Sequence, residues 1–407
     1  MTRDTQLLQA AVIGLRIGLW SGNSRKMELA ESFLQPWTTM IRRAGWFGRK
    51  YEIIVPQPED EGQVLQEKWR KWVEMETHKR LVFFLFRHDA HMSITLSLNP
   101  NISYAELSLP LPHSAQLWQA KTAEAWKAAM LKLPHHQLPS VLDLLQNIDR
   151  YVESRDLFDV EIATYALLSA TWGLVREYRQ QMSITAASPN QWCNGTLLLS
   201  SRLTELKRLL ECLRIGAPDT PSIRVFLETL SMHLHMSLED VHLFAGVEGH
   251  EEAKRVFPSL REWVRTSSAR QAVWHAGQIT RYAKLIPGLA TFNAVAVYHA
   301  ALGFWSYGVM LAATDTASES KSAEAVVCLN GTDESAAQRF IALNRGRAAI
   351  TVAKPEGGEN IALLGNPGEV MQGLITLMRS SHKVRPPQSR PPLVENLLEL
   401  MSGLKGV

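Results

Sequence analysis

The stretch WRKWVEMETHKRLVFFLFRHD, residues 69–89, carries the strongest evidence for the fold. Its apolar and aromatic side chains recur at spacings of three and four, which is the period of an α-helix. On a helical wheel, Glu76, Arg80 and Arg87 point in the direction of Trp69, along the aromatic face. Charges on a face that packs against other helices need partners. Because Glu76 and Arg80 are four residues apart, we expect them to pair with each other inside a helix surrounded by aromatic rings.

The same helical period extends over most of the 407 residues. It predicts helices near 6–20, 25–44, 62–98, 114–130, 139–151, 158–182, 196–213, 222–236, 238–245, 250–265, 268–286, 292–313, 334–344, 367–381 and 392–404. Alternation typical of strands is weak and is confined to AVVCLN and AAITVA, so we expect at most a short two-stranded excursion near 325–353. The sequence therefore predicts an all-α protein with one large multi-helix domain.

Three stretches interrupt the helical pattern. Residues 314–324 form a polar Ser-rich loop, residues 354–360 are rich in turn formers, and the Pro-rich residues 384–392 form a stiff tether to the last helix. The chain shows no internal repeat. We therefore expect a helical domain over 1–313 and a C-terminal extension over 314–407, whose terminal helices pack on the same body.

Composition and charge exclude several classes of protein. Hydrophobic residues make up 46% of the chain, and 43 basic against 40 acidic residues give a net charge of +3, so no overall field favours nucleic acid or an anionic membrane. The first 50 residues hold eight Lys or Arg and three acidic residues, which we interpret as a solvated helix face rather than a phosphate site. Cys193, Cys212 and Cys328 lie too far apart for a CxxC zinc site or a secreted-type disulfide framework.

Residues 292–313, FNAVAVYHAALGFWSYGVMLAA, are long enough to span a bilayer. Polar side chains such as Asn293 and His299 interrupt the apolar run, and no Lys/Arg cluster flanks it. We therefore expect a central helix that is buried by other helices, and no membrane association.

Candidate chemical groups are few. His235, Glu239 and His242 have the spacing of metal ligands on one helix face, but a capping box that begins at Ser237 starts a new helix and leaves His235 outside it. His275 and His299 could act as acid or base, although both lie among apolar residues as core histidines do. We therefore predict no catalytic, cofactor-binding, metal-binding or DNA-binding residues in this chain.

Tryptophan is unusually frequent, and several tryptophans fall inside predicted helices. These are Trp69, Trp72, Trp118, Trp126, Trp263, Trp274 and Trp305. Large rings of this kind suit a wide helical core. A second hypothesis, from a different class, is a helical small-molecule-binding protein or enzyme with a pocket lined by tryptophan and histidine.

Eight motifs occur in a fixed order along the chain. They are GLRIGLWSGNSRKMELAESF with TMIRRAGWF (14–47), EKWRKWVEMETHKRLVFFLFRHDAHMSI (67–94), LPLPHSAQLWQAKTAEAW (109–126), LHMSLEDVHLFAGVEGHEEAKRVFPSLREW (234–263), ARQAVWHAGQITR (269–281), AVYHAALGFWSYG (296–308), QRFIALNRGRAAI (338–350) and PPLVENLLELM (391–401). In this order they resemble the regulatory middle homology region of fungal-specific transcription factors, in the branch that usually carries N-terminal Cys/His zinc fingers.

This resemblance implies an all-helical regulatory domain that acts in RNA polymerase II transcription in the nucleus, often in pathway-specific control of secondary-metabolite gene clusters. It also implies a structural signature, which here comprises Glu76, Arg80, Phe83, Asp89, Trp274, His275, Gln278, Tyr298 and His299. From the predicted pairing of Glu76, we expect Glu76→Ala to disrupt folding, whereas Lys79→Ala should leave the protein folded.

The chain departs from the family pattern in lacking the Cys/His pairs of the fingers, and we expect the first helices of the domain to be missing too. Zinc is therefore expected only in the absent finger domain. DNA would be reached directly or through a partner protein, and co-regulators of transcription are the other expected partners. A homodimer is a further alternative.

Overall fold

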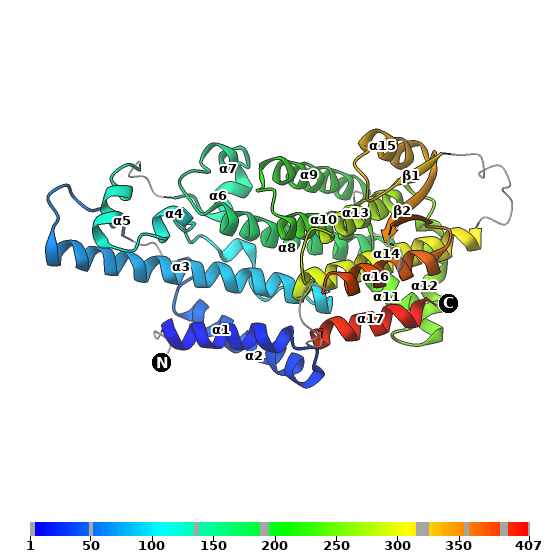
Figure 1. The fold of residues 1–407 in the computed structure, drawn as a ribbon, viewed down its shortest axis with the longest axis horizontal. Helices are drawn as coiled ribbons and strands as arrows, with labels where there is room; N and C mark the ends of the chain where they lie inside the picture. Colours follow the sequence, from blue (N-terminus) through cyan, green and yellow to red (C-terminus); the bar gives the residue numbers. More distant parts are fainter. Residues whose placement is uncertain are drawn as a thin grey trace. The chain divides into compact units, whose positions relative to one another are not determined.

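The computed structural model describes residues 5–48, 52–133, 138–187, 195–314, 325–353, 358–382 and 390–405. Within them lie seventeen α-helices, one short 3-10 helix and one three-stranded sheet (Figure 1). This composition confirms the all-α prediction with its minor β excursion. The chain divides into two compact units: unit 1 comprises Met1–Leu19, Ser24–Glu177 and Thr204–Pro218, and unit 2 comprises Trp20–Asn23, Tyr178–Leu203 and Asp219–Val407.

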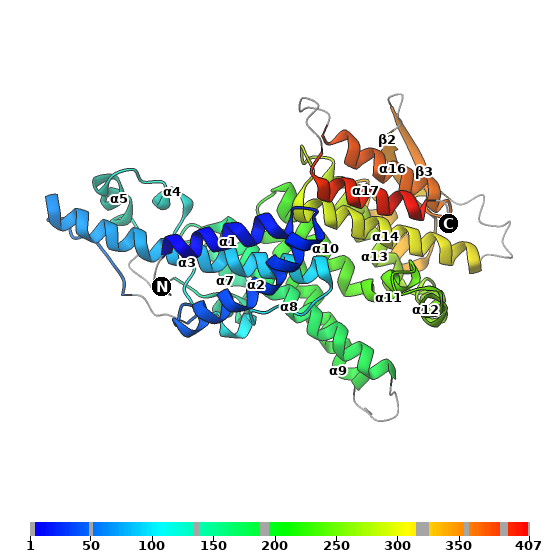
Figure 2. The same ribbon diagram turned by 90° about the horizontal axis from the view of Figure 1, so that it is seen from below.

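Unit 1 is built around α3 (Gly62–Leu96), a helix of 35 residues. The other helices that lie in unit 1, wholly or in part, are α1 (Thr5–Leu19), α2 (Ser24–Arg43), α4 (Ala115–Trp118), α5 (Ala123–Met130), α6 (Val141–Gln146), α7 (Asp149–Glu153), α8 (Val160–Ala187) and α9 (Gly195–Gly216). Helices α1 and α2 form an antiparallel hairpin, and both α1 and α5 lie beside α3 (Figures 1 and 2).

No glycine or proline interrupts α3 after its first residue, which explains how it continues for so many turns. It ends at Ser97, which adopts the left-handed conformation (φ 56°) and donates its backbone N–H to the Ser93 carbonyl. Side chains are buried on several faces of its second half, including Phe83, His88 and Asp89. Polar groups in that half must therefore find partners inside the protein.

Unit 2 centres on three helices, α10 (Pro221–His235), α13 (Ser267–Ala283) and α14 (Thr291–Thr314). Its remaining helices are α11 (Leu238–Phe244), α12 (His250–Trp263), α15 (Glu334–Leu343), α16 (Pro367–Ser380) and α17 (Pro392–Leu404). Helix α14 is long and apolar enough to cross a membrane by composition, but most of it is buried by α10, α13, α16 and α17. It is thus the buried central helix that the sequence predicted.

The sheet belongs to unit 2 and has one strand more than expected. Strand β1 (Val326–Cys328) runs parallel to β2 (Arg347–Ala353), with α15 as the crossover between them, and β3 (Glu359–Leu363) pairs antiparallel with β2. The prediction missed β3 because its first two residues, Glu359 and Asn360, lie inside the segment 354–360 that was predicted as a turn, and both are exposed.

Two glycines allow helices α13 and α16 to lie close to the residues of the sheet. A Cβ on Gly277 of α13 would lie 2.3 Å from the Leu329 carbonyl oxygen, and one on Gly373 of α16 would lie 2.2 Å from a Val352 methyl. Only glycine fits such contacts without displacing a neighbour. Backbone approach of this kind fixes β1 and β2 against the helices.

Most predicted helices match the observed ones to within a few residues, but two were wrong as single helices. The segment 114–130 breaks at Gln119–Thr122, where the Thr122 hydroxyl accepts the Ala125 N–H and starts α5. The segment 139–151 breaks at Asn147 into α6 and α7. In both segments the apolar residues keep the period of a helix across the break, so the pattern alone predicts one continuous helix where the structure has two short ones.

The predicted division at residue 313 stays a prediction. Helices α16 and α17, from the C-terminal extension, contact each other and α14 within unit 2. The Ser-rich loop and most of the Pro-rich tether lie outside the described residues.

Candidate functional site

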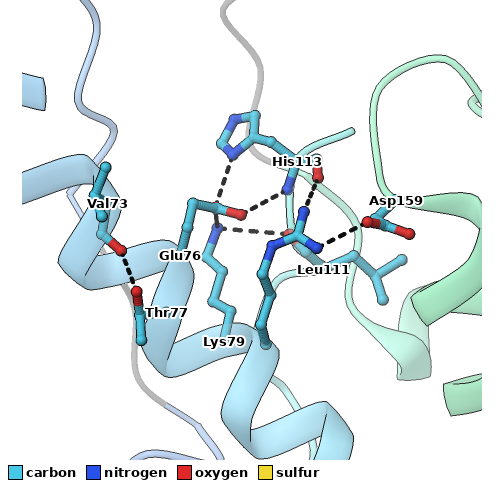
Figure 3. Close-up of polar contacts among 8 residues, drawn as sticks. Val73, Glu76, Thr77, Lys79, Leu111, His113 and Asp159 are labelled. Carbon is cyan, nitrogen blue, oxygen red and sulfur yellow. Dashed lines mark hydrogen bonds and ion pairs between the residues drawn. The ribbon is translucent and has the colours of Figure 1, made fainter. Parts of the chain in front are cut away.

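Two of the predicted signature residues of unit 1, Glu76 and Arg80, belong to an ionic cluster centred on α3 (Figure 3). The Glu76 side chain is completely buried and Lys79 is 3% exposed. Lys79 Nζ lies 2.9 Å from Glu76 Oε1, and His113 Nδ1 lies 2.8 Å from the same oxygen. The backbone N–H of His113 donates to Glu76 Oε2 at 2.9 Å. Both carboxylate oxygens are therefore occupied by groups within unit 1.

Arg80 does not pair with Glu76, so the expected pairing was wrong. Its Nη1 donates to Asp159 Oδ2 at 2.8 Å, at the start of α8, and its Nη2 donates to the His113 carbonyl at 2.9 Å. The guanidinium carbon also lies 4.7 Å from the centroid of the Trp118 ring. On a helix, a residue can pair with side chains both three and four positions away. The helical wheel therefore could not decide whether Lys79 or Arg80 is the partner of Glu76.

The cluster joins three parts of unit 1 through one loop segment. The segment 110–113 bonds to Glu76 and Arg80 of α3, and Pro112 accepts the Asp159 N–H at 3.0 Å. Burial raises the pKa of Glu76, but the His113 hydrogen bond and the Lys79 charge outweigh it and hold that pKa below its usual value. Glu76 is thus an ionised structural anchor with its lone pairs engaged, which is unlike a poised catalytic acid.

Asp89 ties α3 to the following loop. Its Oδ1 accepts from the Asn101 backbone N–H at 3.1 Å and its Oδ2 accepts from the Ile102 N–H at 2.8 Å. Burial raises the Asp89 pKa to about 6, against the lowering effect of these hydrogen bonds. Phe83 lies in the core at 2% exposure. Asp89 therefore joins the last turns of α3 to the loop at residues 101–102, and Phe83 is part of the core.

A second group of signature residues lies in unit 2. His275 Nδ1 is 2.7 Å from Oε2 of the fully buried Glu228, and its ring stacks on His235 with centroids 6.1 Å apart. Gln278 donates to the Leu329 carbonyl at 2.8 Å. These contacts join α13 to α10 and to the end of β1. Trp274 is half-buried beside them on α13.

His299 lies at the centre of a histidine cluster in unit 2. Its Nδ1 is 3.3 Å from His233 Nε2, and the rings of His242 and Tyr298 lie about 6 Å from its own. Burial lowers the His299 pKa well below its usual value and raises that of Tyr298. His299 is thus a neutral, almost completely buried histidine, with the environment of a core residue rather than an acid or base facing substrate.

The metal-ligand candidates do not converge. His235 is the last residue of α10 and its Nδ1 lies 3.0 Å from Ser268 Oγ, whereas Glu239 and His242 lie on α11. The Ser237 hydroxyl caps α11 by accepting the Asp240 N–H, which is one of the two bonds of the predicted capping box and confirms the helix start. In the described part of the chain, no group of three or more His, Cys, Asp or Glu side chains could hold a metal ion.

Tryptophan rings gather in unit 1 around Trp72. Its ring lies 5.7 Å from that of Trp126 and 6.3 Å from that of Trp118, centroid to centroid. Leu65, Met75 and Met130 are buried in the same cluster. The rings therefore pack on each other and on aliphatic side chains, as they do in a helical core.

Sequence reasoning missed Lys79, His113, Asp159 and Glu228 as members of these clusters. Lys79 was detectable, since its spacing of three from Glu76 also allows pairing. His113 sits in the loop motif LPLPH and Asp159 precedes α8, and no periodic signal links either residue to α3. Glu228 lies within the apolar helix α10. A single carboxylate among apolar residues indicates that the group is buried and bonded to a partner inside the protein, so this residue was detectable.

Comparison with known proteins identifies the domain. The family model described as fungal specific transcription factor domain matches residues 1–275. The chain belongs to this family. The matched range includes both the ionic cluster of α3 and the Glu228–His275 contact of this chain. No solved structure matches the chain.

Named relatives are fungal transcription factors and zinc finger proteins. Transcription factor PfmaH of Pestalotiopsis fici is 23% identical over 334 residues, 75% of this chain and 34% of its own length. Zinc finger protein zas1 of Schizosaccharomyces pombe is 22% identical over 60% of this chain and 30% of its own. The nicotinate catabolism cluster-specific transcription factor of Emericella nidulans is 26% identical over 46% of this chain and 21% of its own length. The chain thus spans about a third of the length of PfmaH.

Proposed function

We propose that this chain is the regulatory domain of a fungal regulator of RNA polymerase II transcription and that it acts in the nucleus. The observation that carries the proposal is the family match over residues 1–275. The described geometry supports it, because the buried charges of the signature residues are used in internal contacts that hold the helices together. A domain built in this way offers a stable body for protein contacts rather than a reacting centre.

We propose that DNA is recognised by a part of the regulator other than the described helices. The three cysteines of the chain are too far apart in sequence for the paired ligands of a zinc finger. Two relatives are named as zinc finger proteins, which supports the proposal that separate fingers, or a partner protein, contact DNA. Co-regulators of transcription would then bind this domain.

The regulated genes would belong to one metabolic pathway. This part of the proposal is supported by the name of the Emericella nidulans relative, a factor specific to a catabolic gene cluster. The resemblance described above is the reason for proposing a secondary-metabolite gene cluster as the target; the name of this relative supports control of a single gene cluster.

The rival hypothesis of a helical enzyme or small-molecule binder has weaker support. His275 and His299 engage other side chains, and the tryptophans of unit 1 pack in a core. A metabolite screen by thermal shift tests this rival: stabilisation that His299→Ala abolishes would favour it.

A tethering experiment tests the proposed function. The chain is fused to a heterologous DNA-binding domain in a fungal host, and transcription of a reporter with the matching operator is measured. We expect reporter transcription to change, up or down, relative to the DNA-binding domain alone. Glu76→Ala should abolish the effect by unfolding unit 1, whereas Glu74→Ala, at an exposed position of the same helix, should retain it. An unchanged reporter, with the tagged chain confined to the cytosol, would overturn the proposal.

A further inference from the structure

Two arginines of unit 1 lie against one aromatic ring. The guanidinium carbon of Arg16, on α1, lies 5.3 Å from the centroid of the Phe84 ring on α3. The guanidinium carbon of Arg87, also on α3, lies 5.2 Å from the same centroid and 4.4 Å from the centroid of the Tyr165 ring on α8. Three helices of unit 1 therefore bring two positive charges together around Phe84.

The N–H groups of both guanidiniums remain for another partner. A guanidinium over a ring is attracted by the π face, and its N–H groups can still donate to an oxyanion. Within the described residues, neither Arg16 nor Arg87 forms a hydrogen bond or an ion pair. Arg42 and Arg80 of the same unit, in contrast, are each paired with a carboxylate. The rings thus fix the position of two cations whose hydrogen-bond donors are not used inside the protein.

Solvent reaches this pair of arginines. Arg16 is exposed, as the sequence predicted for the basic residues near the N-terminus, and Arg87 is half-buried. No nitrogen of Arg87 is both buried and without a partner in the described part of the chain, so its N–H groups are open to water. An ion that arrives from solution can therefore contact both guanidiniums.

His88, the residue after Arg87 on α3, provides a second and independent observation. Its side chain is 4% exposed, and its Nε2 atom has no hydrogen-bond partner among the residues that the structure describes. Burial, followed by the charges of Arg16 and Arg87, lowers the pKa of His88 to about 4, which shows that both charges lie close to the ring. A buried polar atom without a partner indicates a contact that water or a ligand completes.

The balance of charge around the two arginines favours an anion. Burial lowers the pKa of Arg87, and the neighbouring charge of Arg16 adds to this effect. Glu161 on α8 acts in the opposite direction, but it is exposed, and no ion pair joins it to either arginine. Burial also lowers the pKa of His91 well below its usual value, so this histidine is neutral and adds no charge. A bound anion would offset the repulsion between the arginines and accept their hydrogen bonds.

We propose that Arg16, Arg87 and His88 form a binding site for a small molecule that carries two oxyanion groups, phosphate or carboxylate. Because both guanidinium carbons lie within 5.3 Å of one ring centre, a molecule of a few atoms can reach both. The bound molecule would link α1 to α3. This site is separate from the pocket lined by tryptophan and histidine in the rival hypothesis, and it does not depend on the proposed function.

Isothermal titration calorimetry of the full chain tests the site. The probes are pyrophosphate and succinate, which carry two oxyanion groups each, and acetate, which carries one. We expect pyrophosphate or succinate to bind at least about tenfold more tightly than acetate, because two charge-assisted contacts replace one. Binding of pyrophosphate supports a phosphate-bearing ligand, and binding of succinate supports a dicarboxylate.

Three variants locate the binding. Arg16→Gln, at an exposed position that should not affect folding, should weaken the bound probe at least about tenfold through loss of a charged hydrogen bond. Arg87→Lys keeps the charge but removes the planar guanidinium, and it should weaken the probe as well. Arg43→Gln, which removes the same charge from an exposed position of α2, is the matched control and should leave binding unchanged. Circular dichroism melting curves check that each variant is folded.

Other results would overturn the proposal. These are equal binding of all three probes, and equal weakening by Arg16→Gln and Arg43→Gln, which would indicate general surface charge. Binding of a glutamate-rich peptide that Arg16→Gln abolishes, without binding of either small probe, would assign the arginines to a partner protein instead. A silent tethering experiment with binding of pyrophosphate or succinate intact would reject the proposed function alone.

Discussion

Lys79 is the lysine partner of Glu76: Nζ and Oε1 lie 2.9 Å apart, and both side chains are almost completely buried. A buried ion pair gains little net stability from its charges, since desolvation offsets their attraction. Loss of Lys79 leaves the buried Glu76 carboxylate with its His113 contacts but without the lysine charge, and loss of Glu76 leaves the buried Lys79 ammonium without that carboxylate. The pair therefore makes folding of unit 1 sensitive to changes at both positions.

We predict that Lys79→Ala lowers the free energy of unfolding by about 3–5 kcal/mol, as does Glu76→Ala, because each leaves a buried charge without its ionic partner. This replaces the expectation from sequence that Lys79 is dispensable. Urea denaturation followed by circular dichroism measures the change. Lys71→Ala, at an exposed position of α3, is the control. A Lys79→Ala midpoint equal to the wild type would contradict the prediction.

Arg80→Lys should lower the free energy of unfolding by about 1.5–3 kcal/mol, the contribution of a hydrogen bond to a charged group. A lysine has a single ammonium and cannot reach both Asp159 and the His113 carbonyl while stacking on Trp118. Arg70→Lys, on the exposed face of α3, should have no effect. The midpoint of chemical unfolding distinguishes the two variants, and equal losses for both would count against a specific role of the guanidinium.

His88 gives unit 1 a dependence on pH. Burial, together with the charges of Arg16 and Arg87, lowers the His88 pKa from 6.5 to about 4. Below pH 6.5 the unfolded chain takes up a proton that the folded chain does not, so this stability is lost as the pH falls from about 6.5 to about 4. The Asp89 pKa, raised to about 6, acts in the opposite direction, since its protonation favours the folded state.

Substitution separates the His88 effect from that of Asp89. As the pH falls from 7 to 4, the free energy of unfolding of His88→Leu should increase by about 3 kcal/mol relative to that of the wild type. This follows from about 1.4 kcal/mol for each unit of the pKa shift. The replacement also removes a buried Nε2 atom that has no hydrogen-bond partner within the described residues. Denaturation curves at several pH values test this, with His250→Leu as an exposed control. A constant difference across the pH range would refute the assignment.

Two alanine substitutions at helical glycines should have opposite effects. Gly277→Ala places a methyl group 2.3 Å from the Leu329 carbonyl and should cost about 1–3 kcal/mol or more through displacement of α13 from the end of β1. Gly14→Ala meets no neighbour and should stabilise α1 by about 0.5–1 kcal/mol. Calorimetric melting temperatures report both changes. Similar shifts for the two would show that packing at Gly277 is looser than described.

Local periodicity alone determines much of this fold. A period of 3.6 residues places nearly every helix, and it correctly assigns the run 292–313 to a buried central helix, because the polar residues of that run are incompatible with lipid. The wheel of α3 correctly puts Glu76 on a packed face, where it is fully buried. The order of eight motifs is sufficient to identify the family that matches residues 1–275.

Tertiary structure alone decided which groups meet. Lys79 and Arg80 are equivalent neighbours of Glu76 by spacing, and only the position of the segment 110–113 and of Asp159 directs Arg80 away from it. Strand β3 forms by pairing with the free edge of β2. Gly14 and Gly277 are both helical glycines, and they differ in that no atom lies within 4 Å of a Cβ on Gly14 whereas the Leu329 carbonyl lies close to one on Gly277. Sequence period reports which face of an element is buried. It carries no information about the distant residue that fills that face, because such contacts depend on how elements far apart in the chain are packed.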